Sequence, residues 1–192
     1  GWMSATETWT VGRLLTWTAD YLKKSGSTSP RLDAEVLLSH ARGCQRIELY
    51  TAFDEEPSEQ VRAAFREMVK RRAEGSPVAY LVGYKEFYSA TFEVNPDVLI
   101  PRPETEHLVV DALDRAKELA ASGKQLQIVD VGTGSGAIAV SVAKHFAKCH
   151  VTAVDISPAA LDVARRNAQR HALADDRNQF VQGDLLSWCK PD

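Results

Sequence analysis

The feature that most constrains this chain is the stretch 128-IVDVGTGSGAIAV-140, which places three glycines within five residues between two apolar runs. Glycine accepts backbone conformations that other residues avoid, and it lets other atoms approach the chain closely. A nucleotide, a phosphate, a methyl donor or a helix packed tightly on a strand would each require glycine here. Residues 132–136, which we call the glycine loop, therefore mark either a ligand site or a tight strand-to-helix turn.

Strands and helices are expected to alternate around the glycine loop. In chain order, the pattern predicts a helix at roughly 104–121, a strand at 126–131, a helix at 137–146, a strand at 150–155, a helix opened by Ser157 and Pro158, and a strand at 178–182. The first of these helices carries an apolar face made of Leu108, Val109, Ala112, Leu113, Ala116 and Leu119. Because the strands are almost entirely apolar, a parallel sheet covered by helices on both faces is predicted.

The first 80 or so residues predict helices instead. The expected helices cover 10–26, 29–43, where Ser29 is the N-cap and Gly43 follows the end, and 58–75. Their buried residues are expected to be Val11, Leu14, Leu15 and Thr18 in the first helix, and Val61, Ala64, Phe65 and Met68 in the third. Residues 86–101 predict a β-hairpin or two short strands, with a turn at Asn95-Pro96 and an extended run at 98–100.

Composition narrows the function classes. The 192 residues carry a net charge of −3, without the basic excess of an electrostatic nucleic-acid binder. Three cysteines without a C-x-x-C pair argue against a disulfide framework or a zinc site and indicate the reducing cytoplasm. No apolar run approaches the roughly 20 residues that span a bilayer. We therefore expect no metal, no membrane partner and no direct nucleic-acid partner.

Two acidic residues help to choose the ligand of the glycine loop. Gly132, Gly134 and Ala137 match the dinucleotide pattern G-x-G-x-x-G/A, and Asp155 ends the next strand, where an acid accepts hydrogen bonds from an adenosine ribose. NAD and S-adenosylmethionine both carry that ribose. Asp130, two residues before the first glycine, would repel a pyrophosphate but attract the ammonium and sulfonium of S-adenosylmethionine. The acid therefore favours the methyl donor and leaves an NAD-dependent dehydrogenase as a minor alternative.

A third acid follows the third strand. The sequence Gly183-Asp184-Leu185 is a common turn, but in a methyltransferase the acid at this place accepts a hydrogen bond from the adenine amine while the next side chain packs on the ring. Because Asp130, Asp155 and Asp184 are expected to follow three successive strands, we expect them to meet at one edge of the sheet.

Together, the runs 99-LIPRPETE-106, 130-DVGTGSGAIA-139 and 154-VDIS-157 resemble the HemK/PrmC family, protein-(glutamine-N5) methyltransferases that act on peptide-chain release factors. The segments 33-DAEVLL-38 and 77-PVAYLVGYKEFY-88 are similar to that family as well. The resemblance implies a helical substrate-docking domain at 4–83, a β-hairpin linker at 84–101, and at 102–192 the first half of a class I, Rossmann-like methyltransferase domain. The implied activity is S-adenosylmethionine-dependent protein methylation in translation termination.

The resemblance also implies roles for individual residues. The methionine part of the cofactor would lie against Gly132, Thr133, Gly134, Ser135 and Gly136. Asp155 would hold the ribose, and Asp184 and Leu185 would lie beside the adenine. Arg102, Pro103, Glu104 and Thr105 would cover the cofactor mouth, although P-R-P-E-T-E is also what a proline-marked helix start looks like.

The family's catalytic tetrapeptide, Asn-Pro-Pro-Tyr, would follow the next strand, beyond Asp192, so no catalytic residue is assigned in this chain. With only the first three strands of the sheet, strand 126–131 is expected to be an edge strand, and we predict that the 192 residues are part of a longer protein. Two alternatives remain open: an N6-adenine DNA methyltransferase, disfavoured by the acidic charge, and a docking module for release factor that does not catalyse.

Overall fold

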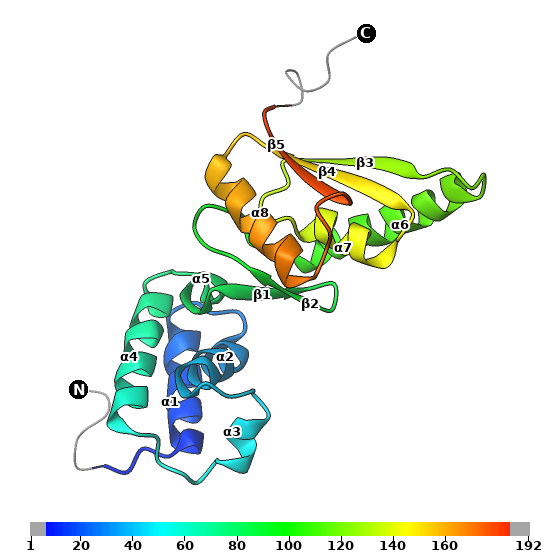
Figure 1. Cartoon of the computed structure of the whole chain (residues 1–192). Helices are drawn as coiled ribbons and strands as arrows, with labels where there is room; N and C mark the ends of the chain where they lie inside the picture. The colour runs from blue at the N-terminus through cyan, green and yellow to red at the C-terminus, as the bar shows by residue number, and fades with distance from the viewer. Residues whose placement is uncertain (1–6, 185–192) are drawn as a thin grey trace. The chain divides into compact units, whose positions relative to one another are not determined.

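The computed structural model describes residues 7–184, and the chain forms two compact units with their boundary between Val82 and Gly83 (Figure 1). The first unit is helical and the second combines helices with a parallel sheet. The predicted order, a helical region followed by an α/β region, is confirmed. Within residues 7–184, no helix is both long and apolar enough to cross a membrane.

The first unit contains five helices among the described residues: α1 (Val11–Lys24), α2 (Pro30–Arg42), α3 (Glu48–Thr51), α4 (Glu59–Ala73) and α5 (Val78–Val82). The three long helices match the predicted segments, and α3 and α5 were not predicted because each is about one turn long. All four residues of the predicted stripe on α1 are buried.

The predicted N-cap position of Ser29 before α2 is confirmed, although its side chain makes no capping hydrogen bond. The buried stripe predicted for the third helix is partly wrong. On α4, the buried residues are Phe65 and Val69, one helical turn apart, while Ala64 is exposed. The buried face of α4 is therefore rotated from the expected stripe, because the position of the neighbouring helices and not the apolar pattern alone decides which side is covered.

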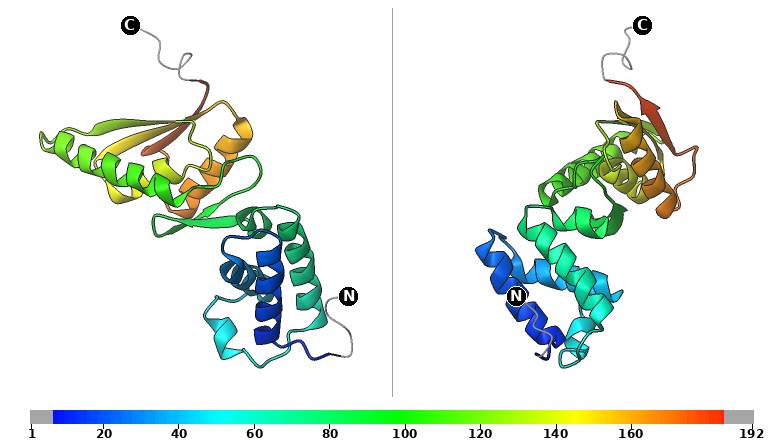
Figure 2. Two further views of the ribbon diagram at one scale, coloured as in Figure 1. Left: turned by 180° about the vertical axis from the view of Figure 1, so that it is seen from behind. Right: turned by 90° about the vertical axis from the view of Figure 1, so that its left-hand side faces the viewer.

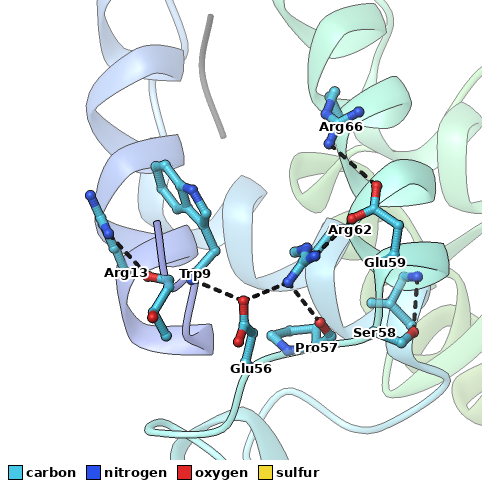
Figure 3. A network of polar contacts seen from close by, with 10 residues as sticks. Trp9, Arg13, Glu56, Pro57, Ser58, Glu59, Arg62 and Arg66 are labelled. Atoms are coloured by element: carbon cyan, nitrogen blue, oxygen red, sulfur yellow. Dashed lines mark hydrogen bonds and ion pairs between the residues drawn. The ribbon is translucent and has the colours of Figure 1, made fainter. Parts of the chain in front are cut away.

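Backbone and charge contacts hold the start of α1 to the segment before α4. The N–H groups of Val11 and Gly12 donate to the carbonyls of Glu55 and Phe53, both at 2.9 Å. These contacts satisfy helix N–H groups that have no partner inside the helix. Figure 3 shows the neighbouring network, in which Glu56 accepts from Arg62 at 2.7 Å and from the backbone N–H of Trp9 at 3.4 Å.

The second unit opens with an antiparallel hairpin of β1 (Tyr84–Phe87) and β2 (Ala90–Glu93). Its turn is formed by Tyr88 and Ser89, both with positive φ (47° and 58°), which is unusual for residues other than glycine, asparagine and aspartate. The hairpin prediction is confirmed, but its boundaries are wrong. Asn95-Pro96 forms a separate turn after the hairpin, and residues 98–100 are not a strand.

The remaining elements of the second unit are η1 (Pro103–Thr105), α6 (Glu106–Ala120), β3 (Leu126–Val131), α7 (Ala137–His145), β4 (Cys149–Asp155), α8 (Pro158–Arg170) and β5 (Asn178–Gln182). The three strands are parallel in the order β3-β4-β5, so β3 is at an edge of the described sheet, as predicted.

The predicted helix cover on both faces of the sheet is wrong for the described residues. Helices α6, α7 and α8 lie on the same side of the sheet (Figures 1 and 2). Along β3, half-buried and exposed side chains alternate, and Val129 and Val131 are 39% and 47% exposed. The face opposite the three helices is therefore open along β3.

The core of the second unit includes the hairpin. Phe87 and Phe92 pack edge to face, with ring centroids 6.0 Å apart, and join Val109 of α6, Val140 of α7 and Val151 of β4 in one buried cluster. A fully buried side chain of this size contributes roughly 1.5–3 kcal/mol to stability. The hairpin is therefore a packed part of the α/β unit.

The predicted apolar face of α6 is only partly buried. Val109, Leu113 and Ala116 are covered, whereas Leu108 and Leu119 are more than half exposed.

Candidate functional site

The glycine loop lies between β3 and α7, and its three glycines all adopt left-handed conformations, with φ of 71° at Gly132, 54° at Gly134 and 80° at Gly136. A side chain at Gly136 would have its Cβ 3.1 Å from the Cβ of Ala164 on α8. At Gly132 and Gly134, no atom of the part of the chain that the structure describes lies within 4 Å of the added Cβ. Close helix packing thus explains Gly136, and the space beside the other two glycines is open to a ligand.

Asp130 lies inside β3, where it pairs with Ala153, and not after the strand. Its carboxylate accepts a hydrogen bond from the Thr133 hydroxyl at 2.8 Å, so it also shapes the loop. Burial raises the pKa of Asp130 above its usual range, and the nearby charge of Asp155 adds to the rise. The Thr133 hydroxyl and the backbone N–H of Ala139 lower the pKa without cancelling the effect of burial.

Asp155 is the last residue of β4 and holds two backbone segments in place. Its Oδ2 accepts the N–H of Gly134 at 2.9 Å, and its Oδ1 accepts the N–H of Ser157 at 3.0 Å, just before α8. A carboxylate has about four lone-pair sites, so these two bonds leave room for the hydroxyls of a ligand. Asp155 therefore lies directly against the glycine loop.

The chain that leaves β5 reaches the same edge of the sheet. The N–H of Gly183 donates to the carbonyl of Asp155 at 3.0 Å, which brings the segment containing Asp184 next to the end of β4. The three acids thus accompany three adjacent parallel strands, as expected from the sequence. Leu185, expected beside the adenine, lies outside the described residues.

The segment Arg102–Thr105 opens α6. Pro103–Thr105 form the single 3-10 turn η1, and the N–H of Thr105 donates to the carbonyl of Arg102 at 3.0 Å. The next residue, Glu106, accepts the N–H of Tyr88 at 2.7 Å and so fixes the hairpin turn. The expected position of Arg102, Pro103, Glu104 and Thr105 over a cofactor mouth stays a prediction.

One residue of this region was missed in the sequence. Asn167 of α8 is fully buried, and its side-chain amide bonds both to the hairpin residue Glu93 and to Ser135 of the glycine loop. A signal was present: Asn167 is a polar residue on the apolar stripe of α8 that includes Ala160, Ala164 and Ala168. Polar groups in such positions are normally hydrogen-bonded, but the partners lie too far away in the sequence to be predicted.

Taken together, the site offers left-handed glycines beside open space and carboxylates on adjacent strands, at the carboxyl edge of a parallel sheet. Ligands of open α/β sheets bind at this edge. The buried hydroxyl side chains of Thr133 and Ser135 complete the loop. The arrangement suits a ligand that carries positive charge and hydroxyl groups.

Comparison with known proteins agrees with this geometry. Residues 13–83 match the family described as PrmC N-terminal domain, and residues 128–192 match a methyltransferase domain family. A protein of Rhodopirellula baltica named release factor glutamine methyltransferase is 58% identical over 184 residues, which are 96% of this chain and 62% of that protein.

Proteins of Koribacter versatilis and Bacillus subtilis with the same name are 44% and 41% identical, over 89% and 92% of this chain. The chain spans about three fifths of the length of these curated relatives.

Proposed function

Because the chain belongs to the PrmC family of release factor glutamine methyltransferases, we propose that it binds S-adenosylmethionine at the glycine loop. The protein then transfers the methyl group to the N5 atom of a glutamine side chain in a peptide-chain release factor. The observation that carries this proposal is the glycine loop flanked by Asp130 and Asp155 at the carboxyl edge of the sheet.

The residues present fit S-adenosylmethionine. Gly132–Gly136 would hold the methionine part, and the negative charge of Asp130 would attract its ammonium and sulfonium. Asp155 would accept hydrogen bonds from the ribose hydroxyls, Asp184 would accept one from the adenine amine, and Leu185 would contact the adenine ring. Arg102, Pro103 and Thr105 border the site from the start of α6.

When bound, the cofactor supplies an electrophilic methyl group. The residues of this chain bind and orient it, so their contribution is positioning and not acid–base chemistry. We propose that an Asn-Pro-Pro-Tyr tetrapeptide binds the amide of the substrate glutamine. This motif does not occur in these 192 residues.

We also propose that three segments of the chain have different functions. Residues 4–83 dock the release factor, residues 84–101, which contain the hairpin β1-β2, link this domain to the next, and residues 102–192 hold the cofactor. The activity belongs to translation termination and thus to the cytoplasm.

Calorimetry of the full-length protein with S-adenosylhomocysteine tests cofactor binding. We expect one site per chain, and failure to bind would refute the proposal. A methyl-transfer assay that offers release factor and DNA side by side tests the acceptor. Transfer to a release-factor glutamine is expected, and transfer to adenine in DNA would replace the proposal by the second enzymatic alternative.

A further inference from the structure

Asn167 makes all its side-chain hydrogen bonds inside the second unit. It is fully buried on α8. Its Oδ1 accepts the N–H of Glu93 at 2.7 Å, while its Nδ2 donates to the carbonyl of Glu93 at 3.0 Å and to the carbonyl of Ser135 at 2.8 Å. The amide thus uses its acceptor and both donors, and it completes the backbone hydrogen bonding of the hairpin and of the glycine loop together.

The bond to Ser135 controls the direction of the next peptide group. The carbonyl of Ser135 and the N–H of Gly136 belong to one planar peptide, so fixing the carbonyl also fixes the N–H. That N–H donates to the carbonyl of Thr133 at 2.8 Å and closes the loop. One turn earlier on α8, the Cβ of Ala164 lies only 3.1 Å from the place that a Cβ on Gly136 would take. Helix α8 therefore approaches the loop closely at Gly136.

Other contacts keep the hairpin on α8 without touching the glycine loop. The ring Nε2 of His171, which follows α8, lies 2.8 Å from the carbonyl of Thr91. Arg166 donates to the side chain of Glu93 at 2.8 Å on the surface. Among these contacts, the bonds of Asn167 are the ones that connect hairpin and loop directly.

We propose that Asn167 is a positioning residue for the cofactor: its amide holds the Ser135–Gly136 peptide in the binding conformation and ties it to the hairpin. This inference rests on the proposed function, since the ligand whose site is positioned is S-adenosylmethionine. A loop that is already ordered before the cofactor binds loses less conformational entropy on binding, and the affinity is higher for that reason.

The test uses Asn167→Asp in the full-length protein, with Asn167→Ala as a second variant. Aspartate has the same shape and can still accept from the N–H of Glu93, but as a carboxylate it cannot donate to the carbonyls of Glu93 and Ser135. We expect both variants to bind S-adenosylhomocysteine at least about tenfold more weakly by calorimetry. The ¹H–¹⁵N amide signals of Gly134 and Gly136 should move in the unliganded variants.

Two controls separate positioning from stability. His171→Ala removes a hairpin contact that does not reach the glycine loop and should lower the melting temperature while leaving the affinity and the glycine amide signals unchanged. Asn178→Ala removes a second buried asparagine, whose side-chain amide has no hydrogen-bond partner among residues 7–184, and should keep the affinity.

The outcomes are distinguishable. If the wild-type protein does not bind S-adenosylhomocysteine, the proposed function fails. If the wild type binds and the Asn167 variants bind equally well, the positioning role is overturned. The role is likewise overturned if His171→Ala weakens binding as much, or if both Asn167 variants lose the fold, because Asn167 would then serve the stability of the unit as a whole.

Discussion

At the scale of single residues, the glycine loop shows that one residue type answers two requirements. All three glycines need a left-handed backbone, but only Gly136 also has another helix within contact distance of its missing side chain. The glycines therefore serve both of the purposes that the sequence left open, close helix packing and access for a ligand. Gly136 serves the packing of α8, and Gly132 and Gly134 leave the approach to the loop open.

Gly136→Ala should therefore destabilise the protein more than backbone strain alone explains. The left-handed backbone costs an alanine about 1–2 kcal/mol, and contact with Ala164 adds to this. Gly123→Ala is the matched control, because Gly123 has a φ of 79° with no described atom within 4 Å of the added Cβ. Urea denaturation of both variants gives the comparison, and equal losses of stability would show that the contact with α8 is unimportant.

Asp130→Asn should raise stability and weaken cofactor binding. Burial raises the pKa of Asp130, so the folded protein holds this proton more tightly than the unfolded chain. The free energy of unfolding of the wild type therefore falls as the pH rises from the ordinary carboxyl range through the raised pKa. Above that window the variant should be more stable, by about 1.4 kcal/mol for each unit of the rise.

Thermal unfolding as a function of pH, together with calorimetry, checks both halves of the expectation. In the wild type, affinity for S-adenosylhomocysteine should fall as the pH drops through the raised pKa, because the protonated acid no longer attracts the ammonium. An asparagine variant that binds as tightly as the wild type at neutral pH would remove Asp130 from the site.

At the scale of elements, apolar periodicity correctly predicted the long helices and the three parallel strands, because the burial of one face of an element produces a periodic local sequence. The position of the hairpin turn was not predicted, because its positive φ values occur at Tyr88 and Ser89 and not at the glycine or asparagine that usually indicates such a turn. The rotation of α4 toward Val69 and the exposure of Leu108 on α6 depend on neighbouring elements. The acids of the site followed from strand order, whereas the role of Asn167 depended on contacts with distant residues.

Helix α1 offers a test of contact against helix propensity. Gly12 lies in its first turn, and a Cβ there would clash with the ring edge of Phe53. Alanine is better than glycine in a helix by about 1 kcal/mol, but here the collision should turn Gly12→Ala into a destabilising change. In a double-mutant cycle, Phe53→Ala should restore the benefit. A gain in stability from Gly12→Ala alone would show that the Phe53 ring moves aside without loss.

At the scale of the whole molecule, β3 presents an unpaired edge and an open apolar face in the described sheet. Exposed strand edges are templates for pairing with another chain. We expect the 192-residue chain to associate at high concentration and Val129→Lys to reduce this association in sedimentation velocity. Leu119→Lys, at an exposed apolar position on α6, is the control. Equal association of the Val129 variant and the wild type would contradict the role of β3.

The bonds between hairpin and α8 also bear on the order of folding. Asn167 and Glu93 are 74 residues apart in the chain, and His171 and Thr91 are 80 apart, whereas Asp155 and Gly134 are separated by 21. Contacts between distant residues close long loops and form slowly. We expect the strands to pair before the hairpin docks, and pulsed hydrogen exchange should protect the amides of β4 before that of Glu93. The glycine loop would then reach its final shape last, when Asn167 meets both of its partners.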